Sequence, residues 1–126
     1  VVAPCGGGLF RSADGGDTWD YLYECYCRAA WIDPADWDHL IFGPADGVSR
    51  NGRIEESHDG GRSWSDISGG LDTPWPQDMV ERFLPVEDRV LAIVTNGQVL
   101  SATPGDWAWE PILGEVAQVN ALVYIS

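Results

Sequence analysis

Four arginines are the residues of this sequence best suited to bind a ligand by charge. They are Arg28, Arg50, Arg53 and Arg82, in a chain whose seven basic residues are all arginine. A guanidinium group holds a carboxylate through two parallel hydrogen bonds, so several such groups on one surface suit a carboxylate ligand. The alternative is that these arginines form surface salt bridges in an acidic protein.

An aromatic side chain and three carboxylates extend this set of candidates. Trp75 is flanked on both sides by proline, and an aromatic residue held by stiff neighbours can stack on a sugar ring or on a protein partner. The alternative is that Trp75 packs back over its own fold. Asp46, Asp72 and Asp78 offer carboxylates in the same predicted loops as these candidates. The predicted ligand-binding residues are Trp75, Arg50, Arg53 and Asp78.

The sequence predicts neither a metal site nor a cofactor. Cys25 and Cys27 are closer together than the cysteine pairs of typical zinc sites, and Cys5 is the third cysteine. His39 begins a predicted strand and His58 occupies a variable position of a repeated motif. Neither histidine therefore indicates a metal ligand or a general base.

A repeated unit must position these residues. Tryptophans and glycines recur at an interval of forty-five residues: Trp19, Trp64 and Trp109, and Gly7, Gly52 and Gly97. Short strand-like runs surround them, and four short strands in a unit of this length are typical of a β-propeller blade. The predicted fold is all-β, with blades of four antiparallel strands. The predicted blades are residues 1–23 with 119–125, residues 27–68 and residues 79–113, within one domain of residues 1–126.

Three blades are fewer than the roughly four to eight from which propellers are usually built. The sequence therefore predicts a piece of a longer propeller or, as the alternative, a chain that associates with itself into a ring. Both alternatives cover sheet edges and blade faces that three blades alone leave bare.

An octapeptide inside the repeat has the composition of a closed turn. SADGGDTW, residues 12–19, recurs as SHDGGRSW, residues 57–64. Its Asp and Ser accept hydrogen bonds from backbone amides, its glycines supply positive φ, and its Trp covers the turn. The predicted structural residues are Ser12, Asp14, Gly16, Thr18 and Trp19, and Ser57, Asp59, Gly61, Ser63 and Trp64.

Both octapeptides resemble the Asp-box, or BNR repeat, Ser-x-Asp-x-Gly-x-Thr/Ser-Trp, of sialidases, sortilin-type receptors and photosystem assembly factors. A third copy, residues 102–109, keeps the Trp but has Pro104 in place of the Asp. The resemblance implies that each motif lies on the turn between the third and fourth strands of a blade. It also implies that the binding pocket lies on the opposite face.

The resemblance to sialidases implies an enzymatic alternative. Sialidases use three arginines with a Tyr/Glu nucleophilic pair, and the candidate catalytic residues for those roles are Arg28, Arg82, Tyr26 and Glu24. The Arg-Ile-Pro motif that usually supplies the first arginine of that family is absent. We therefore expect a non-catalytic module that binds a protein or a glycan through its loops, with part of a sialidase-like glycoside hydrolase as the alternative.

The predicted pocket face consists of the loops inside the blades and the connections into each first strand. These segments are residues 4–8, 24–28, 43–52, 69–81 and 114–118. Cys5 and either Cys25 or Cys27 fall on this face in adjacent blades. Two alternatives stay open for them, a disulfide between Cys5 and one of the other two, or three reduced thiols.

The charge of the chain excludes one class of partner. Twenty acidic residues give a formal net charge of −13, so the chain cannot assemble the basic face that a nucleic acid needs. No apolar run approaches the roughly twenty residues of a membrane span. We expect an extracellular or periplasmic location, because propellers with Asp-boxes are commonly exported.

Overall fold

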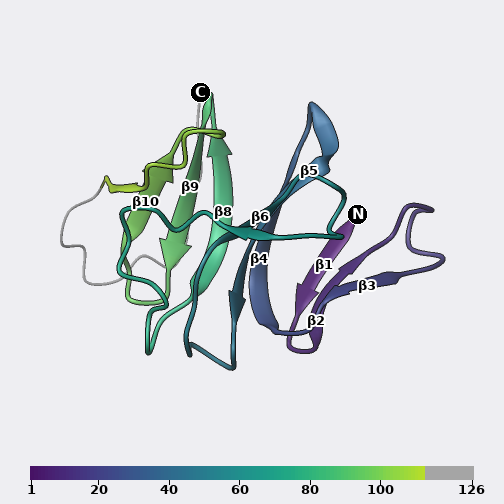
Figure 1. The fold of residues 1–126 in the computed structure, drawn as a ribbon, viewed down its shortest axis with the longest axis horizontal. Helices are drawn as coiled ribbons and strands as arrows, with labels where there is room; N and C mark the ends of the chain where they lie inside the picture. Colours follow the sequence, from purple (N-terminus) through teal and green to yellow (C-terminus); the bar gives the residue numbers. More distant parts are fainter. Residues whose placement is uncertain (113–126) are drawn as a thin grey trace.

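The computed structural model of the protein describes residues 1–112 and consists of three antiparallel sheets, shown side by side in Figure 1. The first sheet contains β1 (Val2–Cys5), β2 (Gly8–Arg11) and β3 (Asp20–Tyr23). The second contains β4 (Tyr26–Asp33), β5 (Asp36–Ala45), β6 (Glu55–Ser57) and β7 (Ser65–Asp66). The third contains β8 (Val80–Val86), β9 (Arg89–Val94), β10 (Val99–Ala102) and β11 (Glu110–Pro111).

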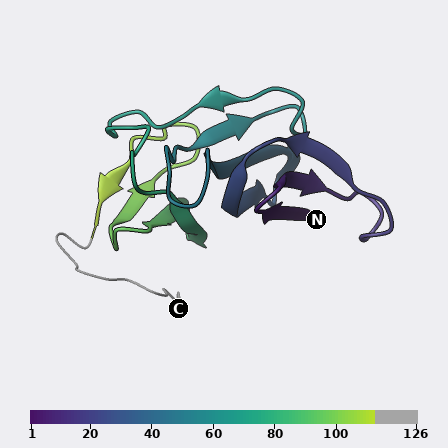
Figure 2. The same ribbon diagram turned by 90° about the horizontal axis from the view of Figure 1, so that it is seen from below.

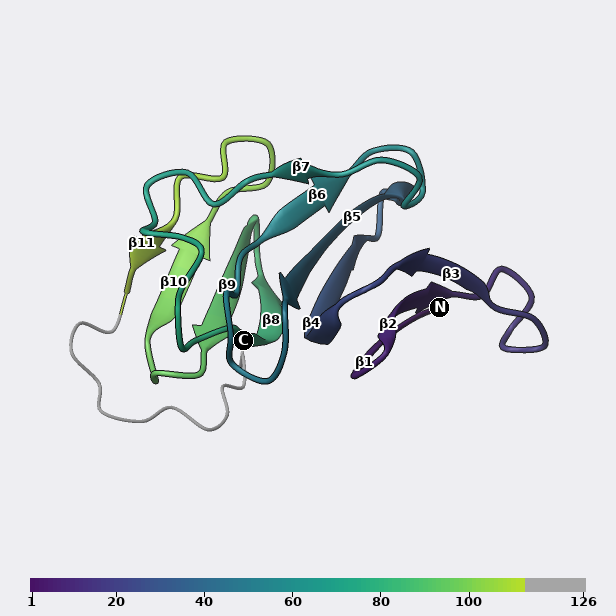
Figure 3. The same ribbon diagram turned by 60° about the horizontal axis from the view of Figure 1, so that its bottom comes forward.

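The three sheets are arranged as blades. Strand neighbours within each sheet are consecutive in sequence, and β4 contacts both β1 and β8. Figure 3 shows β1, β4 and β8 facing one another while β3, β7 and β11 lie on the outside. This all-β arrangement is a partial β-propeller, as the sequence predicts. Residues 113 and 119–125 of the predicted blades lie outside the described residues.

The third sheet is buried on both faces by residues that alternate along its strands. In β9, Val90, Ala92 and Val94 belong to the largest core cluster, whereas Leu91 and Ile93 form a second cluster with Val99. Successive residues of a strand point to opposite faces of the sheet, so a run without polar residues packs on both sides. The sequence of β9 therefore places it inside the molecule.

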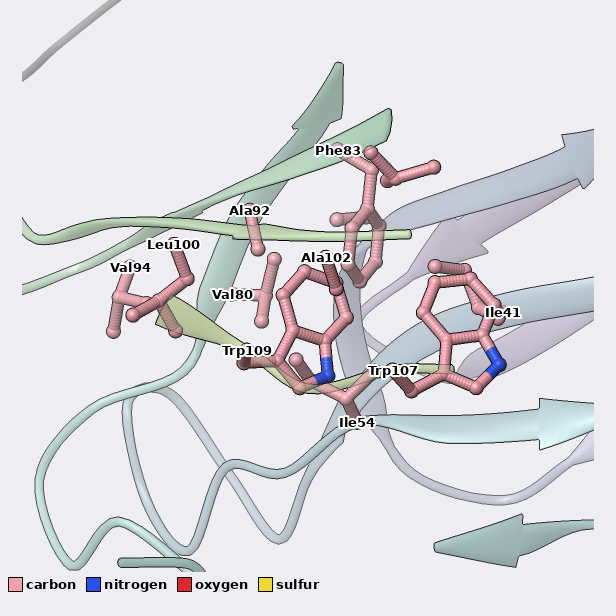
Figure 4. Packing of buried hydrophobic residues seen from close by; sticks show 12 residues of the cluster. Ile41, Ile54, Val80, Phe83, Ala92, Val94, Leu100, Ala102, Trp107 and Trp109 are labelled. Carbon is pink, nitrogen blue, oxygen red and sulfur yellow. The ribbon is translucent and has the colours of Figure 1, made fainter. Parts of the chain in front are cut away.

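Tryptophans fill the core between the second and third sheets. Figure 4 shows Trp107 and Trp109 among the side chains of Phe83, Ile41 and Ile54. The two indole rings are stacked with their centroids 5.7 Å apart. The Nε1 of Trp109 donates a hydrogen bond of 3.0 Å to the carbonyl oxygen of Ile67. Trp109 therefore joins the last sheet to the one before it.

A smaller core joins the first and second sheets. Leu9, Cys27 and Phe42 are buried there, and the partly buried rings of Tyr23 and Trp64 pack against them. The centroid of Phe42 lies 4.5 Å from that of Trp64 and 4.9 Å from that of Tyr23. Aromatic contacts thus connect this pair of sheets as well.

The second octapeptide forms a turn that satisfies its own polar groups. The Oδ1 of Asp59 accepts a hydrogen bond from the Ser63 amide at 2.9 Å, and the Oγ of Ser57 accepts one from the Gly61 amide at 2.9 Å. Gly60 and Gly61 have φ of 74° and 98°, values that glycine adopts without strain. The turn lies between β6 and β7.

The first octapeptide repeats this geometry between β2 and β3. Ser12 Oγ accepts from the Gly16 amide at 2.8 Å, and Asp14 Oδ1 accepts from the Thr18 amide at 2.8 Å. The indole of Trp19 donates to the Gly16 carbonyl at 3.1 Å. We call the two segments, residues 12–19 and 57–64, the octapeptide turns.

The third copy of the motif closes differently. The carbonyl of Thr103 accepts hydrogen bonds from the amides of Asp106 and Trp107, so backbone atoms replace the missing aspartate. Trp107 has a φ of 47° and points into the core shown in Figure 4.

The described part of the chain, residues 1–112, has no helix with the length and apolar character that crossing a bilayer requires.

Candidate functional site

The antiparallel strands give the molecule two distinct faces. The turns between β1 and β2, between β5 and β6, and between β9 and β10 lie at one end of the strands, which we call the loop face. The octapeptide turns and the β4–β5 and β8–β9 turns lie at the other end, the octapeptide face. Figure 2 shows the same three sheets from below. A site on the loop face is therefore separated from a site on the octapeptide face by the length of the strands.

A cleft of about 490 Å³ opens on the loop face between the first and second sheets. Its lining residues are Gly6, Gly7, Glu24, Cys25, Tyr26, Ala45, Asp46 and Gly47. They come from the β1–β2 turn, from the β3–β4 connection with the first residue of β4, and from the end of β5 with the start of the β5–β6 loop. Three of the segments that the sequence assigns to the pocket face, residues 4–8, 24–28 and 43–52, thus meet at this cleft.

Tyr26 provides the aromatic surface of the cleft. A Cβ atom on Gly6 would lie 3.4 Å from the Tyr26 ring, so the glycine lets the ring lie close to the β1–β2 turn. The Tyr26 hydroxyl accepts a hydrogen bond of 3.2 Å from Nε of Arg28. The ring is therefore held by contacts on two sides.

Asp46 provides a fixed carboxylate beside that ring. Its Oδ2 accepts from Asn51 Nδ2 at 3.0 Å, and its Oδ1 accepts from Arg53 at 3.3 Å. The hydrogen bond from Asn51 and the nearby Arg53 guanidinium lower the pKa of Asp46, so the group is ionised at neutral pH. It can accept hydrogen bonds from the hydroxyl groups of a ligand.

A second polar cluster consists of Tyr23, Glu55 and Arg53; the sequence predicted Arg53 as a ligand-binding residue but neither of its two partners. The hydroxyl of Tyr23 donates to Glu55 Oε2 at 2.8 Å, and Arg53 donates to both of them, at 3.1 Å and 2.8 Å. Burial raises the pKa of Tyr23, and so do its hydrogen bond to Glu55 and the negative charge of that residue. The Arg53 guanidinium opposes this increase but does not cancel it. Tyr23 and Glu55 belong to different sheets, and no spacing in the sequence shows how two sheets pack.

The predicted arginine candidates have separate surroundings. Arg28 forms an ion pair with Glu81 that links β4 to β8, whereas Arg53 pairs with Glu55 and Asp46. The Arg50 amide donates to the carbonyl of Gly47 at 3.2 Å, which places it in the β5–β6 loop. Arg82 lies on β8 opposite Ile93. Arg28 and Arg53 are thus already neutralised by carboxylates of this chain.

Trp75 and Asp78 hold the long connection between β7 and β8 in place. The backbone of Trp75 exchanges two hydrogen bonds with Gly52, of 2.9 Å and 3.2 Å, and its partly buried side chain packs against the main core. Asp78 Oδ1 accepts a hydrogen bond of 2.8 Å from the hydroxyl of Thr95. Both residues have structural contacts, and neither lines the cleft.

All three cysteines are free thiols. Cys5 and Cys27 donate to the same acceptor, the carbonyl oxygen of Gly8, at 3.3 Å and 3.4 Å. Cys25 lines the cleft. The first loop and the entry to the second sheet therefore lie together on the loop face.

Sequence reasoning also missed a cluster on the octapeptide face, formed by His39, Glu56 and His58. The first two lie on neighbouring strands, β5 and β6, and are buried although both are polar. A buried histidine in a strand was the one available signal, and its partners depend on strand register.

Comparison with solved structures finds a likeness to an ancestral GH74 enzyme. The TM-score is 0.69 with 18% sequence identity, and the match covers 91% of this chain but only 17% of that protein. The fold is that of β-propeller blades. At this identity the likeness establishes the fold alone. No model of a known protein family matches the sequence, and no curated protein matches it either.

Proposed function

We propose that this chain is an Asp-box, or BNR, β-propeller module that binds a glycan through the loop-face cleft without cleaving it. The observation that carries the proposal is the grouping of the Tyr26 ring with the carboxylates of Glu24 and Asp46 in one cleft. An aromatic ring offers a flat apolar face for a sugar ring, and carboxylates accept hydrogen bonds from its hydroxyl groups. The octapeptide turns support the same proposal, because their polar groups are used within the turns.

The charge of the site favours a neutral glycan. Two carboxylates line the cleft in a chain with a net charge of −13, which repels an acidic sugar. Arg28 and Arg53 are paired with carboxylates of the chain. We therefore infer that a neutral oligosaccharide fits better than a sialic acid, and we propose the exported location expected from the sequence.

One observation favours the alternative, a glycoside hydrolase. The contact of Tyr23 with Glu55 and Arg53 has the composition of a Tyr/Glu nucleophilic pair beside an arginine. These three residues, however, are hydrogen-bonded to one another, and none of them lines the cleft. Binding without cleavage is the better supported of the two.

The test is a titration with a panel of neutral oligosaccharides, monitored by ¹H–¹⁵N spectra. We expect saturable shifts in residues 5–8, 24–26 and 45–47, and a loss of affinity of at least about tenfold in Tyr26→Ala. Trp37→Ala is the matched control, because Trp37 is 72% exposed and lies near the β4–β5 turn on the other face.

Mass spectrometry of the same mixtures separates binding from cleavage. Intact oligosaccharide after prolonged incubation supports a non-catalytic module. Products that disappear in Glu55→Gln would establish the hydrolase instead. Saturable binding that Tyr26→Ala leaves unchanged would refute the cleft as the site.

A further inference from the structure

Two histidines and a glutamate converge on the octapeptide face, at the opposite end of the strands from the loop-face cleft. His39 comes from β5, Glu56 from β6, and His58 from the second octapeptide turn. One side-chain ligand atom of each lies within 4.8 Å of those of the other two. This donor set of two imidazoles and one carboxylate is one that zinc accepts.

The carboxylate of Glu56 bridges the Nε2 atoms of the two imidazoles, whose rings stack with their centroids 4.5 Å apart. Its Oε2 lies 2.6 Å from His39 Nε2, and its Oε1 lies 3.2 Å from His58 Nε2. Neighbouring ligand atoms are about 3.3 Å apart in a tetrahedral site with metal–ligand bonds of about 2.0–2.2 Å. The second distance is close to that separation, whereas the first is that of a hydrogen bond. The two imidazole rings are stacked, so the exposed His58 side chain has to turn for the three donors to meet one ion.

Two further contacts orient the buried donors. Asp33 Oδ2 lies 3.0 Å from His39 Nδ1, so an ion would take Nε2 and replace the hydrogen bond between Nε2 and Glu56. The indole of Trp107 donates to Glu56 Oε2 at 2.6 Å. Carboxylate–histidine pairs and hydrogen-bonded ligand carboxylates are the contacts that hold metal ligands in place.

The cluster is accessible from solvent. A cavity of about 220 Å³ is lined by Glu56, His58, Asp59, Ser63, Trp64 and Ser65. The side chain of His58 is 67% exposed, so it has room to turn toward an ion. The cavity leaves space for water in the remaining coordination position.

The folding motif does not require these side chains. In the first octapeptide turn, Ala13 stands where the second has His58, and Arg11 stands where the second has Glu56. The first turn nevertheless closes with the same Ser and Asp hydrogen bonds. Stability of the turn therefore does not explain why His58 and Glu56 meet.

We propose that the octapeptide face binds one divalent transition-metal ion, best matched by zinc, through His39 Nε2, the Glu56 carboxylate and His58 Nε2. Imidazole ligands select such ions over Mg²⁺ and Ca²⁺, which take oxygen ligands. This inference is independent of the proposed glycan binding, because it concerns the opposite face.

The test is a titration of the protein with ZnCl₂ by isothermal calorimetry, in buffer with excess Mg²⁺. We expect one ion per chain in the wild type and an affinity at least about tenfold lower in His58→Ala. That variant recreates the Ser-Ala-Asp sequence of the first turn, so its fold should be intact. Cys25→Ser is the matched control, since it removes a competing zinc ligand from the loop face, and it should bind zinc like the wild type.

Spectra of the ¹⁵N-labelled protein locate the ion. Zinc should shift the imidazole nitrogens of His39 and His58 and the indole N–H of Trp107. Equal zinc affinity in wild type and His58→Ala, or affinity lost in Cys25→Ser, would overturn the proposal. Unchanged imidazole signals at saturating zinc would do the same.

Discussion

A single hydroxyl group ties each octapeptide turn together. The Oγ of Ser57 donates to Asp59 Oδ1 at 2.8 Å and accepts from the amide of Gly61 at 2.9 Å. Ser57 is 1% exposed, so water cannot replace these bonds. The same arrangement occurs at Ser12.

Ser57→Ala should lower the free energy of unfolding by about 1–3 kcal/mol, because a buried backbone amide loses its acceptor. Urea denaturation followed by tryptophan fluorescence measures the change. Ser65→Ala is the control at an exposed serine of β7, where no more than about 0.5 kcal/mol is expected. Equal midpoints for the two variants would contradict the role assigned to Ser57.

The aspartates of the turns make stability depend on pH in the acid range. Hydrogen bonds from the side chain and amide of Thr18 and from Ser12 lower the pKa of Asp14 to about 2. Bonds from Ser63 and Ser57 lower the pKa of Asp59 in the same way. In the unfolded chain the pKa of an aspartate is about 3.9.

When the pKa of an aspartate is lower in the folded protein than in the unfolded chain, its ionised form stabilises the fold. This stabilisation is complete at pH values above the pKa of the unfolded chain, and it is lost as the pH falls toward the pKa of the folded protein. The melting temperature should therefore drop as pH decreases from about 4 to about 2. Asp59→Asn should flatten this dependence, measured by thermal denaturation across the range. An equally steep loss in the variant would assign the acid sensitivity to other carboxyl groups.

At the scale of elements, Gly52 attaches the β7–β8 connection to the second sheet. Its backbone bonds with Trp75, and its amide also donates to Asp78 at 3.1 Å. A Cβ atom there would overlap the carbonyl oxygen of Asp78 and lie 2.5 Å from Met79 Cα. No side chain fits at this junction.

Gly52→Ala should destabilise the protein by about 1–3 kcal/mol through overpacking and should speed amide exchange at Trp75. Gly69→Ala is the matched control, because a Cβ at Gly69 meets nothing within 4 Å. Chemical denaturation and hydrogen exchange measure the two effects. Similar stability of both variants would show that the junction adapts to a side chain.

The predicted all-β fold with bladed sheets is confirmed, since hydrophobic runs and repeat spacing are local signals. The start of β5 could not be predicted from the sequence, because the strand begins at Asp36, whereas its apolar run begins at Leu40. Residues 36–38 are exposed. Of these, Asp36 pairs with Asp33, and an irregularity in the β4–β5 register follows before Leu40 pairs with Ile32. The contact between Tyr23, Glu55 and Arg53 could not be predicted from the sequence, because it depends on packing between sheets.

At the scale of the whole molecule, two tryptophans hold the second and third sheets together. Trp109 is 5% exposed and stacks on Trp107. Removing a large buried ring leaves a cavity that neighbouring side chains fill only in part.

Trp109→Ala should lower the free energy of unfolding by about 3–5 kcal/mol, and the near-ultraviolet circular dichroism of the stacked pair should weaken. Trp37→Ala, at an exposed ring, should change stability by no more than about 0.5 kcal/mol. Comparable losses in both variants would contradict the described core.

The consecutive strand order of the three sheets shapes the way in which this chain folds and opens. Within residues 1–112, each strand pairs only with its neighbour along the chain, so the described sheets form without pairing between distant strands. Short-range pairing of this kind shortens the search during folding. It also lets one sheet fray while the next stays closed. In hydrogen–deuterium exchange, the backbone amides should accordingly fall into three groups of exchange rate, one for each sheet.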